Sequence, residues 1–169
     1  MRYKAILFDM DGTLLDTLTD MADAVNHILS VHGWPLRTTE EVRAFVGNGA
    51  RRLMERAVPP EVTGGDFEAV LTEYRDWYQT HNCVATAPYP GIPALLAALA
   101  KAGIKTAVVS NKPDATTKTL AARFFPGLPA FGQRDDVPPK PAPDLVFRAL
   151  ETLGVDAADA IYVLSLIHI

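Results

Sequence analysis

The chain has 169 residues, of which 49% are hydrophobic and 21% charged, and its formal net charge is -4, as is typical of one globular domain or a domain with an insertion. Cys83 is the only cysteine, so the sequence excludes a disulfide framework and predicts a cytoplasmic protein. The sequence contains no basic–aromatic cluster typical of nucleic-acid binding and no apolar segment near the roughly 20 residues of a membrane span, so neither partner is expected.

An apolar run from Ala5 to Phe8 ends in two carboxylates, Asp9 and Asp11. A short apolar run bounded by turn signals predicts a buried strand, here over residues 4–9. Side chains two apart on an extended chain point the same way, so both acids should share one volume at the strand's C-terminal end. Ligands bind at that end in open α/β sheets, although an acidic Asp-Gly turn without function is the alternative.

The segment that follows the first strand is predicted to be helical. Thr38 and Glu41 form a capping box at the start of one helix. Gly47-Asn48-Gly49 predicts a loop, because two glycines this close permit backbone conformations that a helix does not favour. The apolar spacing predicts helices over 16–32, 38–45 and 50–58, and a long helix that ends near His81.

From Pro88 onward the predicted elements alternate between helix and strand. This order indicates an α/β fold, with a parallel sheet and a helical module inserted after the first strand. The predicted division is an α/β core of residues 1–15 and 86–169 and a helical insert of residues 16–85. The elements are a helix over 92–102 with Leu95, Leu96 and Leu99 inward, a strand over 104–109, a helix over 115–125, a strand at 130–131, a helix over 144–153 and a strand from 160.

Three polar groups stand at or beside predicted strand ends. Asp9 and Asp11 follow the first strand, Ser110-Asn111 follows the second, and Lys140 lies in a proline-rich segment. Taken singly, Ser110-Asn111 is a common turn pair and Lys140 an ordinary solvated lysine. Together, and in this order on one sheet, they indicate a shared site.

These motifs resemble those of the haloacid dehalogenase (HAD) superfamily. Asp9-Met10-Asp11-Gly12-Thr13 resembles its first motif, D-x-D-x-T, Ser110-Asn111 its second and Lys140 its third. The resemblance implies a Rossmann-like HAD core sheet, with the insert as a helical cap. Residues 46–53, Val-Gly-Asn-Gly-Ala-Arg-Arg-Leu, further resemble the cap of phosphoglycolate phosphatases.

The resemblance implies a phosphatase mechanism with Mg²⁺. Asp9 is the expected nucleophile that forms an aspartyl-phosphate, and Asp11 the expected acid for the leaving group and base for the attacking water. The metal ligands are expected to be the side chain of Asp9 and the backbone carbonyl of Asp11. The groups expected to hold the phosphoryl oxygens are Thr13, Ser110, Asn111 and Lys140.

The expected substrate is a small phosphate ester, with 2-phosphoglycolate, hydrolysed to glycolate and phosphate, as the first choice. Its carboxylate should meet a cation or a loop of backbone N–H groups, which Gly47, Asn48, Gly49 and Arg51 would supply. The alternative for Arg51 is an exposed cationic helix face. Another HAD phosphatase or a sugar-phosphate mutase is the alternative activity, and the oligomeric state is left open.

The end of the chain departs from the family pattern. The fourth motif, Gly-Asp-Ser-x-x-Asp, would fall on Leu164, Ser165, Leu166 and Ile169, so its metal-binding carboxylates are absent. The tail of residues 164–169 suggests a truncation, and we therefore expect weak metal binding and weak or absent activity. A catalytically dead member that binds a phosphorylated ligand is the alternative from a different functional class.

Overall fold

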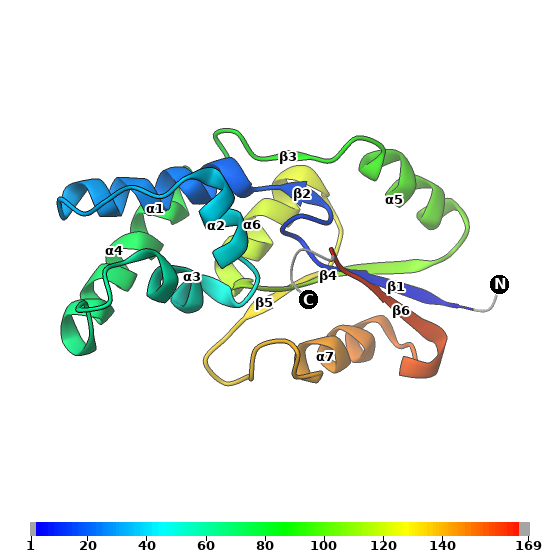
Figure 1. Ribbon diagram of the computed structural model, residues 1–169. Coiled ribbons are helices and arrows are strands. Elements are labelled where there is room, and N and C mark those ends of the chain that lie inside the picture. The colour runs from blue at the N-terminus through cyan, green and yellow to red at the C-terminus, as the bar shows by residue number, and fades with distance from the viewer. Residues whose placement is uncertain (1–2, 166–169) are drawn as a thin grey trace. The chain divides into compact units, whose positions relative to one another are not determined.

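The computed structural model describes residues 3–165, which divide into two compact units (Figure 1). The first unit comprises the chain up to Asp16 and again from Ala87, and the second comprises Thr17–Thr86. The first unit is built on a sheet and the second consists of helices.

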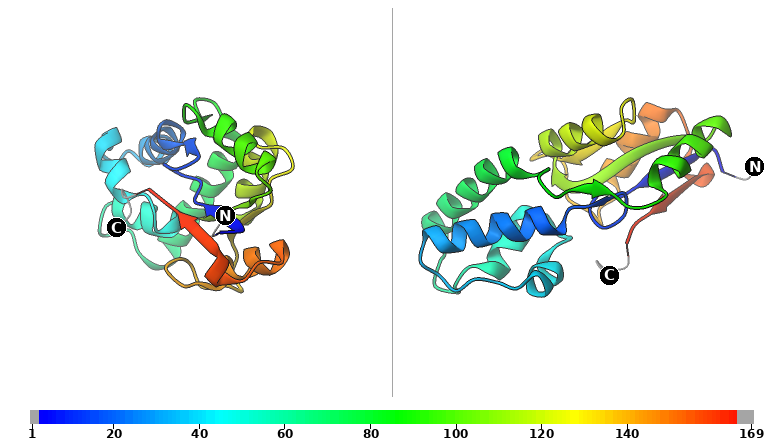
Figure 2. Two further views of the ribbon diagram at one scale, coloured as in Figure 1. Left: turned by 90° about the vertical axis from the view of Figure 1, so that its right-hand side faces the viewer. Right: turned by 90° about the horizontal axis from the view of Figure 1, so that it is seen from above.

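The first unit contains a parallel sheet of four strands, which confirms the predicted α/β class. The strand order is β5 (Ala130–Gln133), β4 (Lys105–Pro113), β1 (Ala5–Phe8) and β6 (Ala160–Val163). Phe8 lies opposite Val108 of β4 and Val163 of β6, and Figure 2 shows these three strands side by side. The carboxyl ends of β1 and β4 therefore meet at one edge of the sheet.

Two short strands that the sequence did not predict join where the insert leaves and returns. They are β2 (Leu15–Asp16) and β3 (Ala87–Pro88), and they pair antiparallel. Leu15 faces Pro88 in this ladder, and the Tyr89 N–H donates to the Leu14 carbonyl at 3.1 Å. This ladder pairs the two chain segments that connect the units.

Three α-helices and one 3₁₀-helix accompany the sheet. In the view of Figure 1, α7 lies below the sheet and α5 above it. Leu145, Ala149 and Leu150 of α7 pack against inward residues of β1 and β4. The helices are α5 (Ile92–Lys101), α6 (Asp114–Phe124), α7 (Asp144–Leu153) and the 3₁₀-helix η1 (Ala157–Asp159).

Two sequence predictions about this unit are wrong. The strand predicted to end at residue 109 continues to Pro113, so Ser110 and Asn111 belong to β4 itself rather than to a following turn. The leucines of α5 are not buried: Leu95 is 42% exposed, and Leu96 and Leu99 are only partly covered. Helical spacing shows which residues share a face, but burial requires another element to cover that face.

Gly132 marks a close approach between β5 and α6. A Cβ built on this glycine would lie 2.5 Å from Cα of Asp114 and 2.7 Å from the carbonyl oxygen of Lys112. The Gly132 N–H also donates to Asp114 Oδ1 at 3.1 Å. Any larger residue would force α6 away from the strand.

The second unit contains four helices around their own apolar core. Val25 and Leu29 of α1 and Leu71 and Tyr74 of α4 are among its buried residues. The helices are α1 (Leu18–Val31), α2 (Thr39–Phe45), α3 (Gly49–Ala57) and α4 (Gly64–His81). Within residues 3–165, no helix is both long and apolar enough to cross a membrane.

The capping box predicted for α2 is confirmed. Thr38 Oγ1 accepts a hydrogen bond from the Glu41 N–H at 3.2 Å, and Glu41 Oε2 accepts one from the Thr38 N–H at 2.8 Å. Two donors at the helix start are thereby satisfied by local sequence alone. The hydrogen bond from the Thr38 backbone, followed by that from its hydroxyl, holds the pKa of Glu41 below its ordinary value of 4.5.

A buried carboxylate holds the two ends of the second unit together. Asp20, in the first turn of α1, is 2% exposed. It accepts hydrogen bonds from the backbone N–H groups of Val84, Ala85 and Thr86 at 3.0, 2.8 and 2.9 Å, and from the Thr86 hydroxyl at 2.7 Å. Hydrogen bonds to an ionised acceptor are the stronger kind, so this contact fixes the returning chain against α1.

Candidate active site

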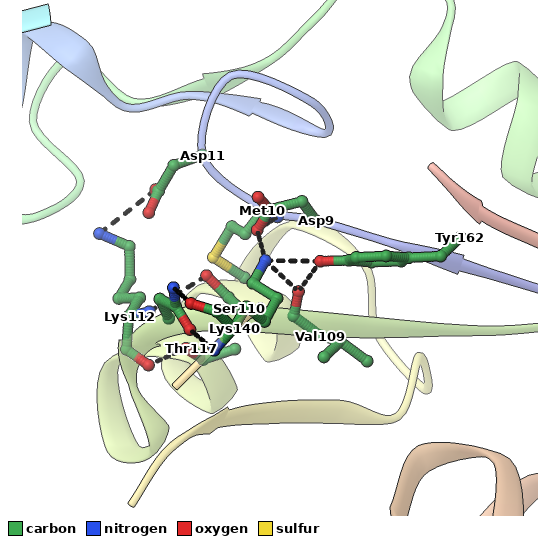
Figure 3. Close-up of polar contacts among 10 residues, drawn as sticks. Asp9, Met10, Asp11, Val109, Ser110, Lys112, Thr117, Lys140 and Tyr162 are labelled. Atoms are coloured by element: carbon green, nitrogen blue, oxygen red, sulfur yellow. Dashed lines mark hydrogen bonds and ion pairs between the residues drawn. The ribbon is translucent and has the colours of Figure 1, made fainter. Parts of the chain in front are cut away.

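Asp9 lies directly beyond β1, at the carboxyl edge of the sheet. Its side chain is nearly buried, and the residue as a whole is 8% exposed. Oδ1 accepts a hydrogen bond from the Met10 N–H at 2.8 Å and lies 2.9 Å from Nζ of Lys140 (Figure 3). Within residues 3–165, Oδ2 makes no hydrogen bond or ion pair, so one carboxylate oxygen is anchored and the other is available.

Lys140 reaches Asp9 from a loop far along the chain. Its ammonium also donates to the Val109 carbonyl at 3.1 Å and to the Tyr162 hydroxyl. The Asn111 side chain holds the Lys140 backbone: Oδ1 accepts from the Lys140 N–H at 2.7 Å, and Nδ2 donates to its carbonyl at 3.2 Å. Asn111, predicted to bind phosphate, therefore positions the loop that carries Lys140.

Tyr162 is a site residue that the sequence analysis missed. Its hydroxyl donates to the Val109 carbonyl at 3.0 Å and contacts Nζ of Lys140. Burial, and to a lesser extent the negative charge of Asp9, raise the pKa of this hydroxyl, so it remains a neutral donor. Its place on β6, beside β1, was the available signal, because β6 was predicted to join the same sheet.

Asp11 faces a second lysine, Lys112, which the sequence analysis did not single out. Nζ of Lys112 lies 3.3 Å from Oδ1 of Asp11, and the two side chains are 3% and 15% exposed. Figure 3 shows Lys112 extending to Asp11 and Lys140 turned toward Asp9. Each carboxylate thus has its own cation, which relieves the repulsion expected between two neighbouring acids.

The two predicted hydroxyl ligands occupy different environments. Ser110 is 1% exposed, and its Oγ accepts a hydrogen bond from the Lys112 N–H at 3.2 Å. The Thr13 hydroxyl oxygen is buried and has no hydrogen-bond partner among the described residues. A buried hydroxyl without a partner is costly, which fits a group that is completed when an oxygen-rich ligand binds.

The predicted specificity residues all lie in the second unit. Gly47 and Gly49 have φ angles of 116° and 82°, which explains why glycine is needed on both sides of Asn48. Gly49 begins α3, so the loop is shorter by one residue than predicted. Arg51 is held by two hydrogen bonds to Glu68, both 2.8 Å long, and both side chains are about half exposed. A contact of these residues with a substrate stays a prediction.

The residues of this site do not make a complete magnesium site. Among the described residues, no group of three His, Cys, Asp or Glu side chains could hold a metal ion. Asp9 and Asp11 are each bound to a lysine, and Leu164 and Ser165 stand where the fourth motif would begin. Leu166 and Ile169, the other two positions of that motif, lie outside the described residues.

The chain is similar in sequence to known phosphatases of one hydrolase family. The sequence profile of the haloacid dehalogenase-like hydrolases matches residues 3–163. The chain is 35% identical to an N-acetylmuramic acid 6-phosphate phosphatase of Pseudomonas aeruginosa, over 96% of this chain and 74% of that protein. It is 34% identical to a phosphoglycolate phosphatase of Pseudomonas savastanoi pv. phaseolicola, over 95% of this chain but only 61% of that protein.

A similar crystal structure is that of a candidate phosphoglycolate phosphatase from Lactobacillus delbrueckii subsp. bulgaricus. It is 33% identical, with a TM-score of 0.89 over 96% of this chain and 78% of that chain. The chain thus spans about three fifths to four fifths of the length of these three relatives.

Proposed function

The chain belongs to the haloacid dehalogenase-like hydrolase family, where its relatives are phosphoric monoester hydrolases, and we propose that it hydrolyses a small phosphate monoester, 2-phosphoglycolate. One observation carries this proposal: at the carboxyl edge of the sheet, two carboxylates pair with two separate lysines. Asp9 pairs with Lys140, and Asp11 pairs with Lys112. Phosphoryl transfer depends mainly on such positioning and charge neutralisation. A cytoplasmic location, with no nucleic-acid or membrane partner, belongs to the same proposal.

In this proposal Asp9 Oδ2 is the attacking atom. Oδ1 is held by the Met10 N–H and by Lys140, which leaves Oδ2 to form a bond to phosphorus. The bond from phosphorus to the ester oxygen breaks as the aspartyl-phosphate forms, and Asp11 transfers its proton to the leaving oxygen. Asp11 then takes a proton from water, which attacks the phosphorus and releases phosphate from Asp9.

Three residues are proposed to hold the phosphoryl oxygens, and a fourth, Asn111, to position one of them. The Lys140 ammonium supplies charge close to Asp9, and Thr13 supplies a hydroxyl that lacks a partner within residues 3–165. Ser110 offers a hydroxyl whose O–H can donate to a phosphoryl oxygen while its Oγ accepts a hydrogen bond from the Lys112 N–H. Asn111 contributes through the loop of Lys140, which its side chain binds.

N-acetylmuramic acid 6-phosphate is a second candidate substrate, because the chain is similar to a phosphatase named for that ester. A catalytically dead protein that binds a phosphorylated ligand is favoured instead by the non-acidic Leu164 and Ser165. One assay separates these possibilities: phosphate release from 2-phosphoglycolate, N-acetylmuramic acid 6-phosphate and glucose 6-phosphate, measured for the wild type and for Asp9→Asn. We expect slow turnover of 2-phosphoglycolate that is lost in Asp9→Asn. Equal measurable rates in both proteins would show that Asp9 is not the nucleophile, and no phosphate release from any of the esters would favour the catalytically dead protein.

Magnesium is proposed to bind weakly. When bound, it would screen the anionic nucleophile from the anionic phosphate. The Asp9 carboxylate and the Asp11 carbonyl are the available ligands, and no cluster of three acidic, His or Cys side chains completes a site among the described residues. Ser165→Asp supplies an acid where the family carries one, so it should raise Mg²⁺ affinity about 10-fold or more in a calorimetric titration. Ser165→Asn is the matched control without the charge.

A further inference from the structure

Lys112 is a buried cation to which the proposed hydrolysis assigns no contact with the substrate. It lies near the end of β4, and its side chain is 3% exposed. Its backbone is fixed on both sides, because its N–H donates to Ser110 Oγ at 3.2 Å and its carbonyl accepts from Thr117 Oγ1 at 3.1 Å. Lysine is almost never this buried without a charged partner, and Asp11 is that partner here.

The two lysines of the site serve different ends of a bound ester. Lys140 contacts Asp9, which attacks phosphorus, and so lies at the phosphoryl end. Lys112 contacts Asp11, which in the proposed mechanism protonates the ester oxygen, and so lies at the leaving-group end. A negative charge carried close to the ester oxygen would therefore approach Lys112 rather than Lys140.

We propose that Lys112 is a specificity residue that binds a carboxylate on the leaving group, which selects α-carboxylate esters such as 2-phosphoglycolate. This inference rests on the proposed function. An ammonium has three donors, so Lys112 can keep its contact with Asp11 while it donates to a substrate carboxylate. In 2-phosphoglycolate the carboxylate carbon is two bonds from the ester oxygen. In N-acetylmuramic acid 6-phosphate the carboxylate belongs to a lactyl group on the far side of the sugar ring, so Lys112 favours the former.

Binding of two phosphonates tests this assignment without requiring turnover. In 3-phosphonopropionate a methylene replaces the ester oxygen of 2-phosphoglycolate, and propylphosphonate lacks only the carboxylate. Calorimetric titration of the wild type in the presence of magnesium should show about 10- to 100-fold tighter binding of 3-phosphonopropionate, the range expected for a hydrogen bond between charged groups. Lys112→Met should abolish most of this preference and leave the affinity for propylphosphonate nearly unchanged.

Lys118→Met is the matched control, because it removes the same charge from an exposed pair with Asp114 on α6. It should retain the wild-type preference for 3-phosphonopropionate. Equal affinity of the wild type for the two phosphonates would overturn the role of Lys112, whether or not Lys112→Met folds. An equal loss for both ligands in Lys112→Met would also overturn it, since Lys112 would then act only through Asp11. A wild type that binds neither phosphonate would refute the proposed function as well.

Discussion

Replacing Lys140 with methionine should destabilise the first unit by leaving the Asp9 carboxylate without its cation. The ammonium lies 2.9 Å from Asp9 Oδ1, and the side chains of Lys140 and Asp9 are 13% and 11% exposed. In Lys140→Met the carboxylate would keep only the Met10 N–H as a donor to Oδ1. A charge that is largely removed from water and has lost its partner is among the most destabilising features in a fold.

The expected loss in free energy of unfolding is about 3 kcal/mol. Breaking a buried ion pair from one side typically costs about 3–5 kcal/mol, and the remaining exposure of both side chains favours the lower end. The other two contacts of the ammonium add little, because the Tyr162 hydroxyl and the Val109 carbonyl remain hydrogen-bonded to each other at 3.0 Å. Methionine occupies a similar volume, so packing should change little.

A double-mutant cycle with Asp9→Asn, measured by urea unfolding and circular dichroism, isolates the charge pair. The double variant buries neither charge, so its destabilisation should be smaller than the sum of the two single changes by about 1–3 kcal/mol. Lys118→Met, in an exposed pair with Asp114, should cost less than about 1 kcal/mol. Additivity within about 0.5 kcal/mol would show that Lys140 and Asp9 do not interact as described.

Three further outcomes are expected. Asp20→Asn should lower the free energy of unfolding by about 1.5–3 kcal/mol in urea titrations, because an amide nitrogen would then face a backbone N–H of residues 84–86; an unchanged midpoint would contradict this. Gly132→Ala should cost about 1–3 kcal/mol of thermal stability, since its Cβ would meet the α6 backbone at 2.5 Å, and an unaltered melting curve would count against that packing. Thr38→Ala should raise the pKa of Glu41 in an NMR titration without fully restoring it, because the backbone N–H still donates; an unmoved pKa would rule out the hydroxyl's part. Because this pKa is lowered in the fold, the capping box stabilises the protein above about pH 4.5 and loses that effect as the pH falls further.

Local sequence was sufficient for most elements of the fold. The capping box at Thr38 and Glu41 depends on residues three apart, and it was confirmed atom by atom. The alternation of helices and strands after Pro88 likewise predicted a parallel sheet. The prediction for Leu95 was wrong, because its burial depends on whether another element covers α5 and not on the helix itself.

The sequence by itself placed Asp9 and Asp11 at the end of a buried strand, because a short apolar run and its turn are local features. Through the family resemblance it also supplied Lys140, as a candidate phosphate-binding residue. Only the tertiary structure decided which cation each acid meets, since that depends on the parallel register of β1 against β4, in which Phe8 lies opposite Val108. With that register, Lys112 of β4 contacts Asp11, and Lys140 contacts Asp9. The residue periodicity of β1 or of β4 alone does not contain this information.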